Sequence, residues 1–360
     1  TILQGDVIER LQDIEDNTIQ CVVTSPPYWG LRDYGTATWI GGDEDCSHKR
    51  ESKKSEKTIT GHKNFEEMNG VGDAIYKTKC HRCGATREDE QLGLEETPEE
   101  YVENMVKVFR EVKRALKDDG TLWLNLGDTY VANKGNSKAG FNERYFGKKF
   151  KTDKQSDTYK NTNITIKNPN APKNLVGIPW RVAFALQQDG WYLRQDIIWH
   201  KPNPMPESVT DRCTKSHEYI FLLTKSANYY YDAESIKEKT LTYDNTNRDR
   251  DTTRLNNTPG RTRMAGLKTN NYEKRNKRSV WKINTKPYKD AHFAVFPEKL
   301  PELCIKAGSK KGDIVLDPFF GSGTTGYVAQ RLYRKWLGIE LNPEYIKIAN
   351  KRFVQQELFV

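Results

Sequence analysis

Three segments of the sequence predict an α/β fold. A β-branched run at residues 21–23 has the composition of a buried strand, and two prolines soon end it because proline donates no ladder hydrogen bond. A helical pattern at 97–117 runs into an apolar strand at 121–125. Another strand, at 313–317, leads through a glycine-rich turn into a helix. Strands that alternate with helices along the chain indicate the α/β class.

The composition is that of a large, polar chain. Its 360 residues are enough for one large domain or two ordinary ones, with 36% hydrophobic and 30% charged residues. The net charge of +9 suggests a polyanionic partner. No apolar run reaches membrane-spanning length and no signal peptide is evident, so we expect no membrane association. Six cysteines are too few for a disulfide scaffold, which indicates a reducing, cytoplasmic setting.

Residues 1–29 have the pattern of strand, helix and strand, and the second strand ends in an unusual motif. The chain starts at Thr1 rather than Met, so we expect that at least one residue preceded it. The motif is Thr24-Ser25-Pro26-Pro27-Tyr28-Trp29, in which the prolines hold the Ser25 hydroxyl and nearby carbonyls rigid beside the Tyr28 ring. A polar notch next to an aromatic ring suits a flat ligand that bears an amine. A plain loop after a core strand fits these residues equally well.

Residues 30–96 are polar, lack helix or strand periodicity and are interpreted as an insertion. The pattern C-x-x-C-G at residues 80–84 is typical of a zinc-knuckle turn, in which two thiolates bind one ion. We expect Zn²⁺ on four ligands: Cys46, His48, Cys80 and Cys83. His62 and His81 are alternative fourth ligands, and two unrelated thiol pairs are the alternative to a metal site. Because no general base lies nearby in the sequence, the zinc is expected to be structural.

The segment 97–235 holds the clearest helix and a second insertion. Thr97, Pro98 and Glu100 form the N-cap, first turn and capping box of the helix at 97–117. A polar, Lys- and Asn-rich insertion covers 131–174. Three elements are expected after it, namely a helix at 179–188 and two strands, at 191–199 and 218–224, that form a hairpin.

Residues 236–289 carry a strong excess of positive charge. This region has 15 Lys and Arg against 5 Asp and Glu, together with many Asn and Thr residues and the aromatic residues Tyr272 and Trp281. These residue types contact phosphates and base edges, so we expect the region to bind nucleic acid rather than to be a solvated surface only.

The last segment, 290–360, returns to alternating helices and strands and contains a second site. No lysine follows the glycines of 318–326, so the turn is not a phosphate-binding P-loop. Glu340 ends the next strand, 23 residues after Asp317, and can accept the ribose hydroxyls of an adenosine. Asp317 disfavours a pyrophosphate and favours a cationic ligand. S-adenosylmethionine, which has an adenosine, an ammonium and a sulfonium but no phosphate, fits both acids.

Together the two motifs resemble the amino-group DNA methyltransferases of the permuted β type. In that family a catalytic segment is followed by a target-recognition region and then by the glycine motif. This chain has the same order: TSPPYW at 24–29, the basic region at 236–289 and DPFFGSGTT at 317–325. The resemblance covers most of the chain outside the two insertions and includes the segments WHKPNP at 199–204 and HEYI at 217–220.

The resemblance implies a Rossmann-like sheet of seven mostly parallel strands with one reversed strand and helices on both faces. It places the first and last segments of the chain side by side. The implied domain order is a catalytic part (1–29), a zinc-binding insertion (30–96), the catalytic domain continued (97–235), target recognition (236–289) and a cofactor-binding part (290–360). The implied cofactor-binding residues are Asp6, Thr24, Asp317, Pro318, Phe319, Gly321, Ser322, Gly323, Thr324 and Glu340.

The implied activity is methyl transfer from S-adenosylmethionine to an exocyclic amine of a base flipped out of duplex DNA. The catalytic residues would be Ser25, Pro26, Pro27 and Tyr28, and the DNA contacts Trp29, Arg261, Arg263, Lys274 and Arg275. The Ser-Pro-Pro-Tyr form resembles cytosine-N4 enzymes, and adenine N6 is the alternative target. Less favoured are an RNA substrate and a non-enzymatic zinc-stapled DNA-binding protein. The sequence leaves open whether a cognate restriction endonuclease accompanies the enzyme.

Overall fold

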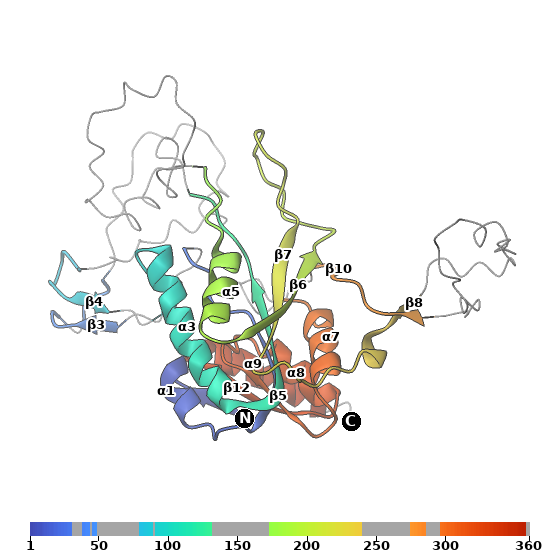
Figure 1. Ribbon diagram of the computed structural model, residues 1–360. Coiled ribbons are helices and arrows are strands. Elements are labelled where there is room, and N and C mark those ends of the chain that lie inside the picture. The colour runs from blue at the N-terminus through green and yellow to red at the C-terminus, as the bar shows by residue number, and fades with distance from the viewer. Residues whose placement is uncertain are drawn as a thin grey trace, which may run out of the picture. The chain divides into compact units, whose positions relative to one another are not determined.

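A computed structural model describes residues 1–30, 38–43, 45–48, 79–88, 91–131, 173–239, 274–285 and 296–357 (Figure 1). The chain divides into two compact units. The first comprises Thr1–Pro26, Met105–Asp128 and Gly177–Val360, and the second comprises Pro27–Asn104 and Thr129–Val176. The insertions predicted at 30–96 and 131–174 fall in the second unit.

The first unit is built on one sheet with the strand order β1-β12-β11-β2-β5-β7-β6-β10. Strand β7 is antiparallel to both of its neighbours, and all other neighbouring strands are parallel. The strands are β1 (Ile2–Gln4), β2 (Ile19–Thr24), β5 (Leu116–Leu126), β6 (Tyr192–His200), β7 (His217–Thr224), β10 (Val280–Lys282), β11 (Ile314–Asp317) and β12 (Lys335–Glu340). This confirms the mostly parallel sheet with one reversed strand and the β6–β7 hairpin.

The sheet has eight strands rather than the expected seven. The additional strand is β10, a short edge strand that pairs with β6 through the register Trp281↔Trp199. It comes from the basic region, whose polar composition gives little strand signal. The first strand of the chain, β1, pairs with β12 near the other end of the chain, with Gln4 beside Glu340. The expected meeting of the first and last segments is therefore confirmed.

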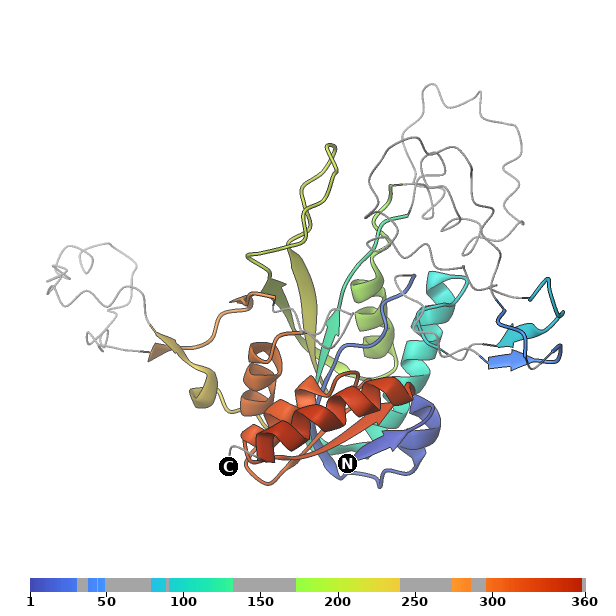
Figure 2. The ribbon, with the colours of Figure 1, turned by 180° about the vertical axis from the view of Figure 1, so that it is seen from behind.

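Helices cover both faces of this sheet, as Figures 1 and 2 show. They are α1 (Val7–Gln12), α3 (Pro98–Ala115), α5 (Ile178–Gln188), α7 (Lys299–Gly308), α8 (Thr324–Arg331) and α9 (Pro343–Glu357). The predicted capping box of α3 is present, because the Glu100 N–H donates to Thr97 Oγ1 (3.2 Å) and the Thr97 N–H donates to the Glu100 carboxylate (3.3 Å). No helix in the described part of the chain is long and apolar enough to span a bilayer.

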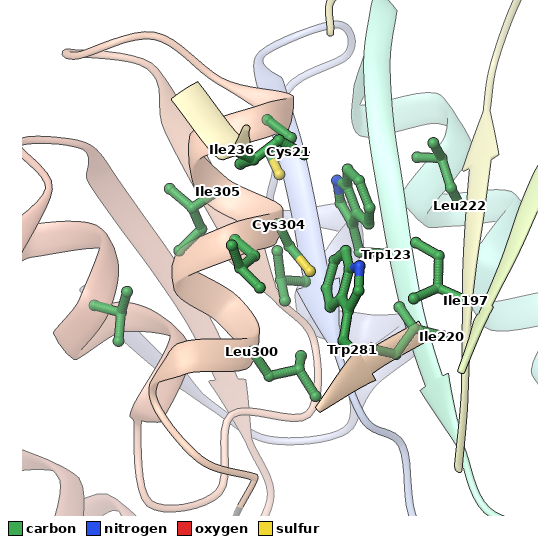
Figure 3. Close-up of a cluster of buried hydrophobic side chains, with 14 of the residues drawn as sticks. Cys21, Trp123, Ile197, Ile220, Leu222, Ile236, Trp281, Leu300, Cys304 and Ile305 are labelled. Atoms are coloured by element: carbon green, nitrogen blue, oxygen red, sulfur yellow. The ribbon is translucent and has the colours of Figure 1, made fainter. Parts of the chain in front are cut away.

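Alternating residues of the central strands supply the two buried faces. Cys21 and Val23 of β2 and Trp123 of β5 belong to one buried cluster with Leu300 and Cys304 of α7 (Figure 3). On the other face, the Trp180 ring of α5 packs edge-on against Phe221 of β7 at 5.1 Å. Since successive strand residues point to opposite faces, this pattern fixes the register of the sheet and so the residues that emerge at its ends.

Trp281 is part of this core and not of a nucleic-acid surface. Its side chain is 2% exposed and its ring lies 6.2 Å from that of Trp123. Figure 3 shows both tryptophans within the buried cluster. The expectation that this tryptophan contributes to base contacts is wrong, because β10 turns it inward against the sheet. Its neighbour Val280 points outward and is 57% exposed.

The second unit contains a small antiparallel hairpin in its described part. Strand β3 (Thr38–Ile40) pairs with β4 (Thr86–Glu88) through the register Trp39↔Arg87. Two strands of three residues are too short to be stable alone in water. The hairpin therefore needs another source of stability.

Candidate functional site

The two sequence motifs meet at the carboxyl edge of the sheet. Strands β2 and β11 are parallel neighbours with Val22 opposite Leu316, so both run to the same edge. Ser25 follows the last residue of β2, and Asp317 is the last residue of β11. In open α/β sheets, ligands bind at this edge of the strands.

A buried carboxylate joins the two motifs. Asp317 is 1% exposed, and its Oδ1 accepts hydrogen bonds from Thr24 Oγ1 (2.7 Å) and from the Phe319 N–H (3.1 Å). Its Oδ2 lies 2.7 Å from Thr325 Oγ1, which is also 3.2 Å from the Val23 carbonyl oxygen. The carboxylate thus fixes the end of β2, the start of the glycine turn and the start of α8 relative to one another.

Burial raises the pKa of Asp317 from 3.8 to about 7. Removal from water disfavours the charged carboxylate, and the hydrogen bonds from Thr24, Thr325 and Phe319 offset only part of this effect. The nearby Glu340 carboxylate raises the pKa of Asp317 further. A buried acid of this kind favours a positively charged ligand beside it.

Glu340 holds the glycine turn from the neighbouring strand. Its two carboxylate oxygens accept hydrogen bonds from the N–H groups of Gly321 (2.7 Å) and Asn342 (2.8 Å). Burial raises the pKa of this carboxyl as well. A carboxylate has about four acceptor positions, so Glu340 can still accept a hydrogen bond from a ribose hydroxyl.

The glycine turn after β11 approaches β12 closely because β12 has a glycine, Gly338, at the position that the Phe320 ring covers. A Cβ on Gly338 would be 2.3 Å from that ring, which also stacks on Trp336 with centroids 5.3 Å apart. Gly321 has a φ of +52°, and a Cβ there would meet nothing within 4 Å. The Phe320 ring therefore anchors the turn against β12, and the space beside Gly321 is open.

Asp6, one of the cofactor residues that the resemblance implies, lies next to the end of β12. The Gly5 N–H donates to the Glu340 carbonyl oxygen at 3.1 Å, which brings the loop after β1 to the carboxylate. Asp6 Oδ1 accepts hydrogen bonds from the N–H groups of Ile8 (2.8 Å) and Glu9 (3.2 Å), so it is the N-cap of α1.

The residues at this edge fit S-adenosylmethionine. The buried carboxylate of Asp317 and the half-buried carboxylate of Glu340 match a cationic group and a ribose diol, and no lysine is present in the glycine turn to bind a phosphate. Ser322 supplies a third polar group, because its hydroxyl is buried and has no hydrogen-bond partner in the described part of the chain. Asp317, Glu340, Ser322 and the open side of Gly321 would hold the cofactor.

Two features of this edge were missing from the predicted site. Thr325 holds Asp317, and its only sequence signal is a hydroxyl side chain at the first turn of the helix after the glycines. Further along the edge, Asn125 Nδ2 donates to Glu218 Oε2 (3.2 Å) and to the Tyr219 carbonyl oxygen (3.0 Å), and Lys201 forms an ion pair with Glu218. These residues are far apart in sequence and meet only through strand pairing.

The motif continues into the second unit, where its backbone is held. The Pro27 carbonyl oxygen accepts a hydrogen bond from the Tyr101 hydroxyl at 2.9 Å. Trp29 is 2% exposed and donates from Nε1 to the Glu95 carbonyl oxygen at 3.1 Å. The prediction that Trp29 contacts DNA disagrees with this burial, which gives the tryptophan a supporting role in the unit. Tyr28 is half-buried.

The second unit also brings together the four predicted zinc ligands. The ligand atoms of Cys46, His48, Cys80 and Cys83 lie within 4.8 Å of one another. The His48 ring stacks on Trp39 of β3 with centroids 4.1 Å apart, and backbone hydrogen bonds involving Asp43 and Ala85 lower the pKa of Cys83 to about 6.

These features suit Zn²⁺, which binds thiolate sulfur and imidazole nitrogen. The alternative ligand His81 is not in the cluster, and His62 lies outside the described residues. An ion here would join the segment that follows β3 to the segment that precedes β4.

The predicted basic surface is only partly described. Arg261 and Arg263 lie outside the described residues. Strand β9 (Lys274–Arg275) pairs with β8 (Glu238–Lys239), and Glu238 accepts from Arg275 (2.9 Å), Lys277 (3.3 Å) and Arg278 (2.5 Å). Lys277 and Arg278 were not among the predicted DNA contacts. One acid among three cations leaves this cluster positively charged, and Lys274 is exposed beside it.

Comparisons with known proteins agree with the fold. A family model described as DNA methylase, of the N6/N4 methyltransferases, matches residues 19–351. The chain is 41% identical over 359 residues to the Type II methyltransferase M.SmaI of Serratia marcescens, covering 99% of this chain and 91% of that protein.

Two solved structures share the fold. The PvuII DNA methyltransferase (cytosine-N4-specific) is 19% identical with a TM-score of 0.55, over 98% of this chain and 86% of that one. A putative DNA modification methylase of Thermus thermophilus, in complex with S-adenosyl-L-methionine, is 21% identical with a TM-score of 0.50, over 98% of this chain and 93% of that one.

The sheet and its two motifs are those of a methyltransferase. The chain belongs to the N6/N4 DNA methylase family. It is therefore a DNA methyltransferase that depends on S-adenosylmethionine, and its substrate is DNA.

Proposed function

We propose that this enzyme methylates the exocyclic N4 amine of cytosine at a specific site in duplex DNA. The observation that carries this proposal is Ser25, a neutral hydroxyl directly after β2, at the edge where Asp317 and Glu340 lie. The resemblance noted above associates Ser-Pro-Pro-Tyr with cytosine-N4 enzymes, and adenine enzymes of the family usually have Asp or Asn at this position. The PvuII enzyme is itself named cytosine-N4-specific.

The enzyme must activate and orient a weak nucleophile, the exocyclic amine of the base. The lone pair of an exocyclic amine is conjugated with the ring, so the amine must move toward tetrahedral geometry before it can attack. The Ser25 hydroxyl and the Pro26 carbonyl oxygen can accept its two hydrogens, draw them out of the ring plane and so release the lone pair from conjugation with the ring. When bound, S-adenosylmethionine supplies an electrophilic methyl group. Orientation by Ser25 and Pro26 then supplies much of the rate.

The surrounding residues take supporting roles in this proposal. Tyr28 stacks on the flipped base, and Pro27 fixes the direction of the backbone. Thr24 is held by Asp317 at 2.7 Å, which keeps Ser25 at a constant place relative to the cofactor residues. No covalent thiolate takes part. The insertion at 30–96 carries a structural zinc, and the region 236–289 recognises the target sequence.

Identification of the modified nucleoside tests this proposal. Plasmid DNA is incubated with the enzyme and methyl-labelled S-adenosylmethionine, digested to nucleosides and separated beside standards. Label in N4-methylcytosine supports the assignment, whereas label in N6-methyladenine establishes the alternative target. Label in RNA in a parallel reaction while DNA stays unlabelled, or no label together with tight DNA binding, overturns the assignment of methyl transfer to DNA.

A cognate restriction endonuclease is a further part of the proposal, because M.SmaI is named a Type II methyltransferase. Its test is protection: a plasmid methylated by this enzyme should resist an endonuclease that cuts the same site. The endonuclease is sought in the host extract with unmethylated plasmid as substrate, and equal cutting of both plasmids contradicts the pairing.

A further inference from the structure

The loop that joins β6 to β7, at the carboxyl edge of the sheet, carries a highly exposed apolar side chain. Residues 201–216 extend beyond the ends of these strands, as both ribbon views show. Met205, between Pro204 and Pro206, is 85% exposed, more than any other large hydrophobic residue in the described part of the chain. Packing in the hydrophobic core therefore does not explain why an apolar residue stands at this position.

The loop is braced by specific hydrogen bonds. Asn203 Nδ2 donates to the Thr285 carbonyl oxygen (3.2 Å), and the Thr285 N–H donates back to Asn203 Oδ1 (3.0 Å). On the other arm, Glu207 forms an ion pair with Arg212 at 2.5 Å. Two prolines and these contacts restrict the backbone around Met205, so little further entropy is lost when its tip is docked.

The loop starts at the edge that holds Ser25. Strands β2 and β6 point the same way and are separated by β5 and β7, so their ends lie three strand spacings, about 15 Å, apart. Lys201 and Lys215 stand at the base of the loop, where Lys215 Nζ donates to the Asp128 carbonyl oxygen at 3.0 Å. A duplex whose target base reaches Ser25 therefore passes within reach of Met205.

We propose that Met205 is an apolar wedge that enters the base stack of the bound duplex and supports extrusion of the target base. The inference rests on the proposed DNA methyltransferase function and deepens it. Flipping a base breaks its pairing and stacking, and proteins that open a base step often insert an apolar side chain such as methionine. The unbranched thioether of Met205 can fill an irregular gap in the stack.

The test compares matched and weakened base pairs in single-turnover methylation. The methylated site is first mapped on plasmid DNA with the wild-type enzyme, and two duplexes are made, one fully paired and one with the target base opposite an abasic position. We expect Met205→Ala to methylate the paired duplex about tenfold more slowly than the wild type, since the wedge offsets part of the flipping cost. On the duplex with the abasic position, the two rates should agree within about threefold.

Met205→Leu is the matched control, because it keeps an apolar side chain of similar size and should retain the wild-type rate. Met205 is not part of the buried core, so circular dichroism and cofactor affinity of both variants should be unchanged. A 2-aminopurine beside the target base should brighten less on binding Met205→Ala than on binding the wild type.

Equal rates for Met205→Ala and the wild type on paired DNA overturn the wedge. So does an equal loss on both duplexes, which indicates a general DNA contact. A change in oligomeric state with unchanged methylation assigns the loop to protein association instead. A wild-type enzyme that labels neither duplex nor plasmid overturns the proposed function itself, which is a distinct result.

Discussion

Thr24 and Asp317 are 293 residues apart in sequence, and Thr24 Oγ1 donates a 2.7 Å hydrogen bond to Asp317 Oδ1. Thr24 precedes Ser25, and Asp317 opens the glycine turn, so this contact sets the distance between the two halves of the site. Thr325 completes the arrangement at Asp317 Oδ2 and can turn its hydroxyl to the Val23 carbonyl oxygen instead. The carboxyl can therefore hold a proton without losing its partners.

The first prediction concerns the dependence of stability on pH. The pKa of Asp317 is about 7 in the folded chain and near 3.8 when unfolded, so between these values the folded chain binds the extra proton. The contribution of Asp317 to the free energy of unfolding is fully present below pH 3.8 and falls as the pH rises. It is lost above about pH 7, and the total fall is up to about 4 kcal/mol. Urea unfolding of the wild type at pH 5 and 8 measures this fall.

Asp317→Asn should flatten most of the decline while the protein stays folded. An amide can accept from Thr24, and its Nδ2 can donate to Thr325 once that hydroxyl turns to Val23. A smaller slope should remain from Glu340, whose raised pKa acts in the same direction. An Asp317→Asn variant with the same pH slope as the wild type would contradict the assignment of the titration to this carboxyl.

The second prediction concerns cofactor affinity. A cationic ligand favours the charged form of a neighbouring carboxyl, so binding of S-adenosylmethionine should lower the pKa of Asp317 and release a proton. We expect the Kd to fall about tenfold from pH 6 to pH 8 and then level off. Calorimetry in buffers of different ionisation enthalpy counts the released protons. Asp317→Asn should bind more weakly with little pH dependence, and an equally pH-dependent variant argues against this role.

The strands and the turn at this edge could be predicted from the sequence because the two motifs are local. Cys21–Thr24 and Asp317–Thr325 are short runs in which strand, turn and helix signals agree. The edge strand β10 was not predicted, since three residues in a basic, polar region have too little apolar periodicity. Trp281 was misassigned for the same reason. The network of Asn125, Lys201 and Glu218 depends on which strands pair, and no local pattern carries that information.

The third prediction separates chemistry from cofactor binding. Ser25→Ala removes a hydroxyl that accepts an amine hydrogen but leaves Asp317 and Glu340 intact. We expect the methylation rate to fall on the order of 100-fold, as when one oriented polar contact to a reacting group is lost. The affinity for S-adenosylmethionine, measured by calorimetry, should stay within about twofold of the wild type. Loss of cofactor binding would show that Ser25 belongs to the other half of the site.

The fourth prediction concerns the metal. Purified protein should contain about one zinc per chain by elemental analysis, and Cys80→Ser should remove it, since tetrahedral sites need all four ligands. Cys213, which is exposed and outside the cluster, offers the matched control, and Cys213→Ser should keep the zinc. On metal removal, amide exchange should accelerate in 79–88 while β2 and β5 stay protected, because the hairpin is too short to hold alone. Metal-free protein with a protected hairpin rules out a structural zinc.

The fifth prediction concerns the cations around Glu238. Lys274 is exposed and not paired with this acid, so Lys274→Ala should weaken DNA binding at all sequences. The slope of log K against log salt concentration should shrink by about 0.9 if one phosphate contact is lost. Glu238→Gln should act in the opposite direction, because Arg275, Lys277 and Arg278 lose their only shared carboxylate in the described cluster and can turn to phosphates. Fluorescence anisotropy over a salt series measures both variants, and slopes equal to that of the wild type would place the DNA path away from the β8–β9 hairpin.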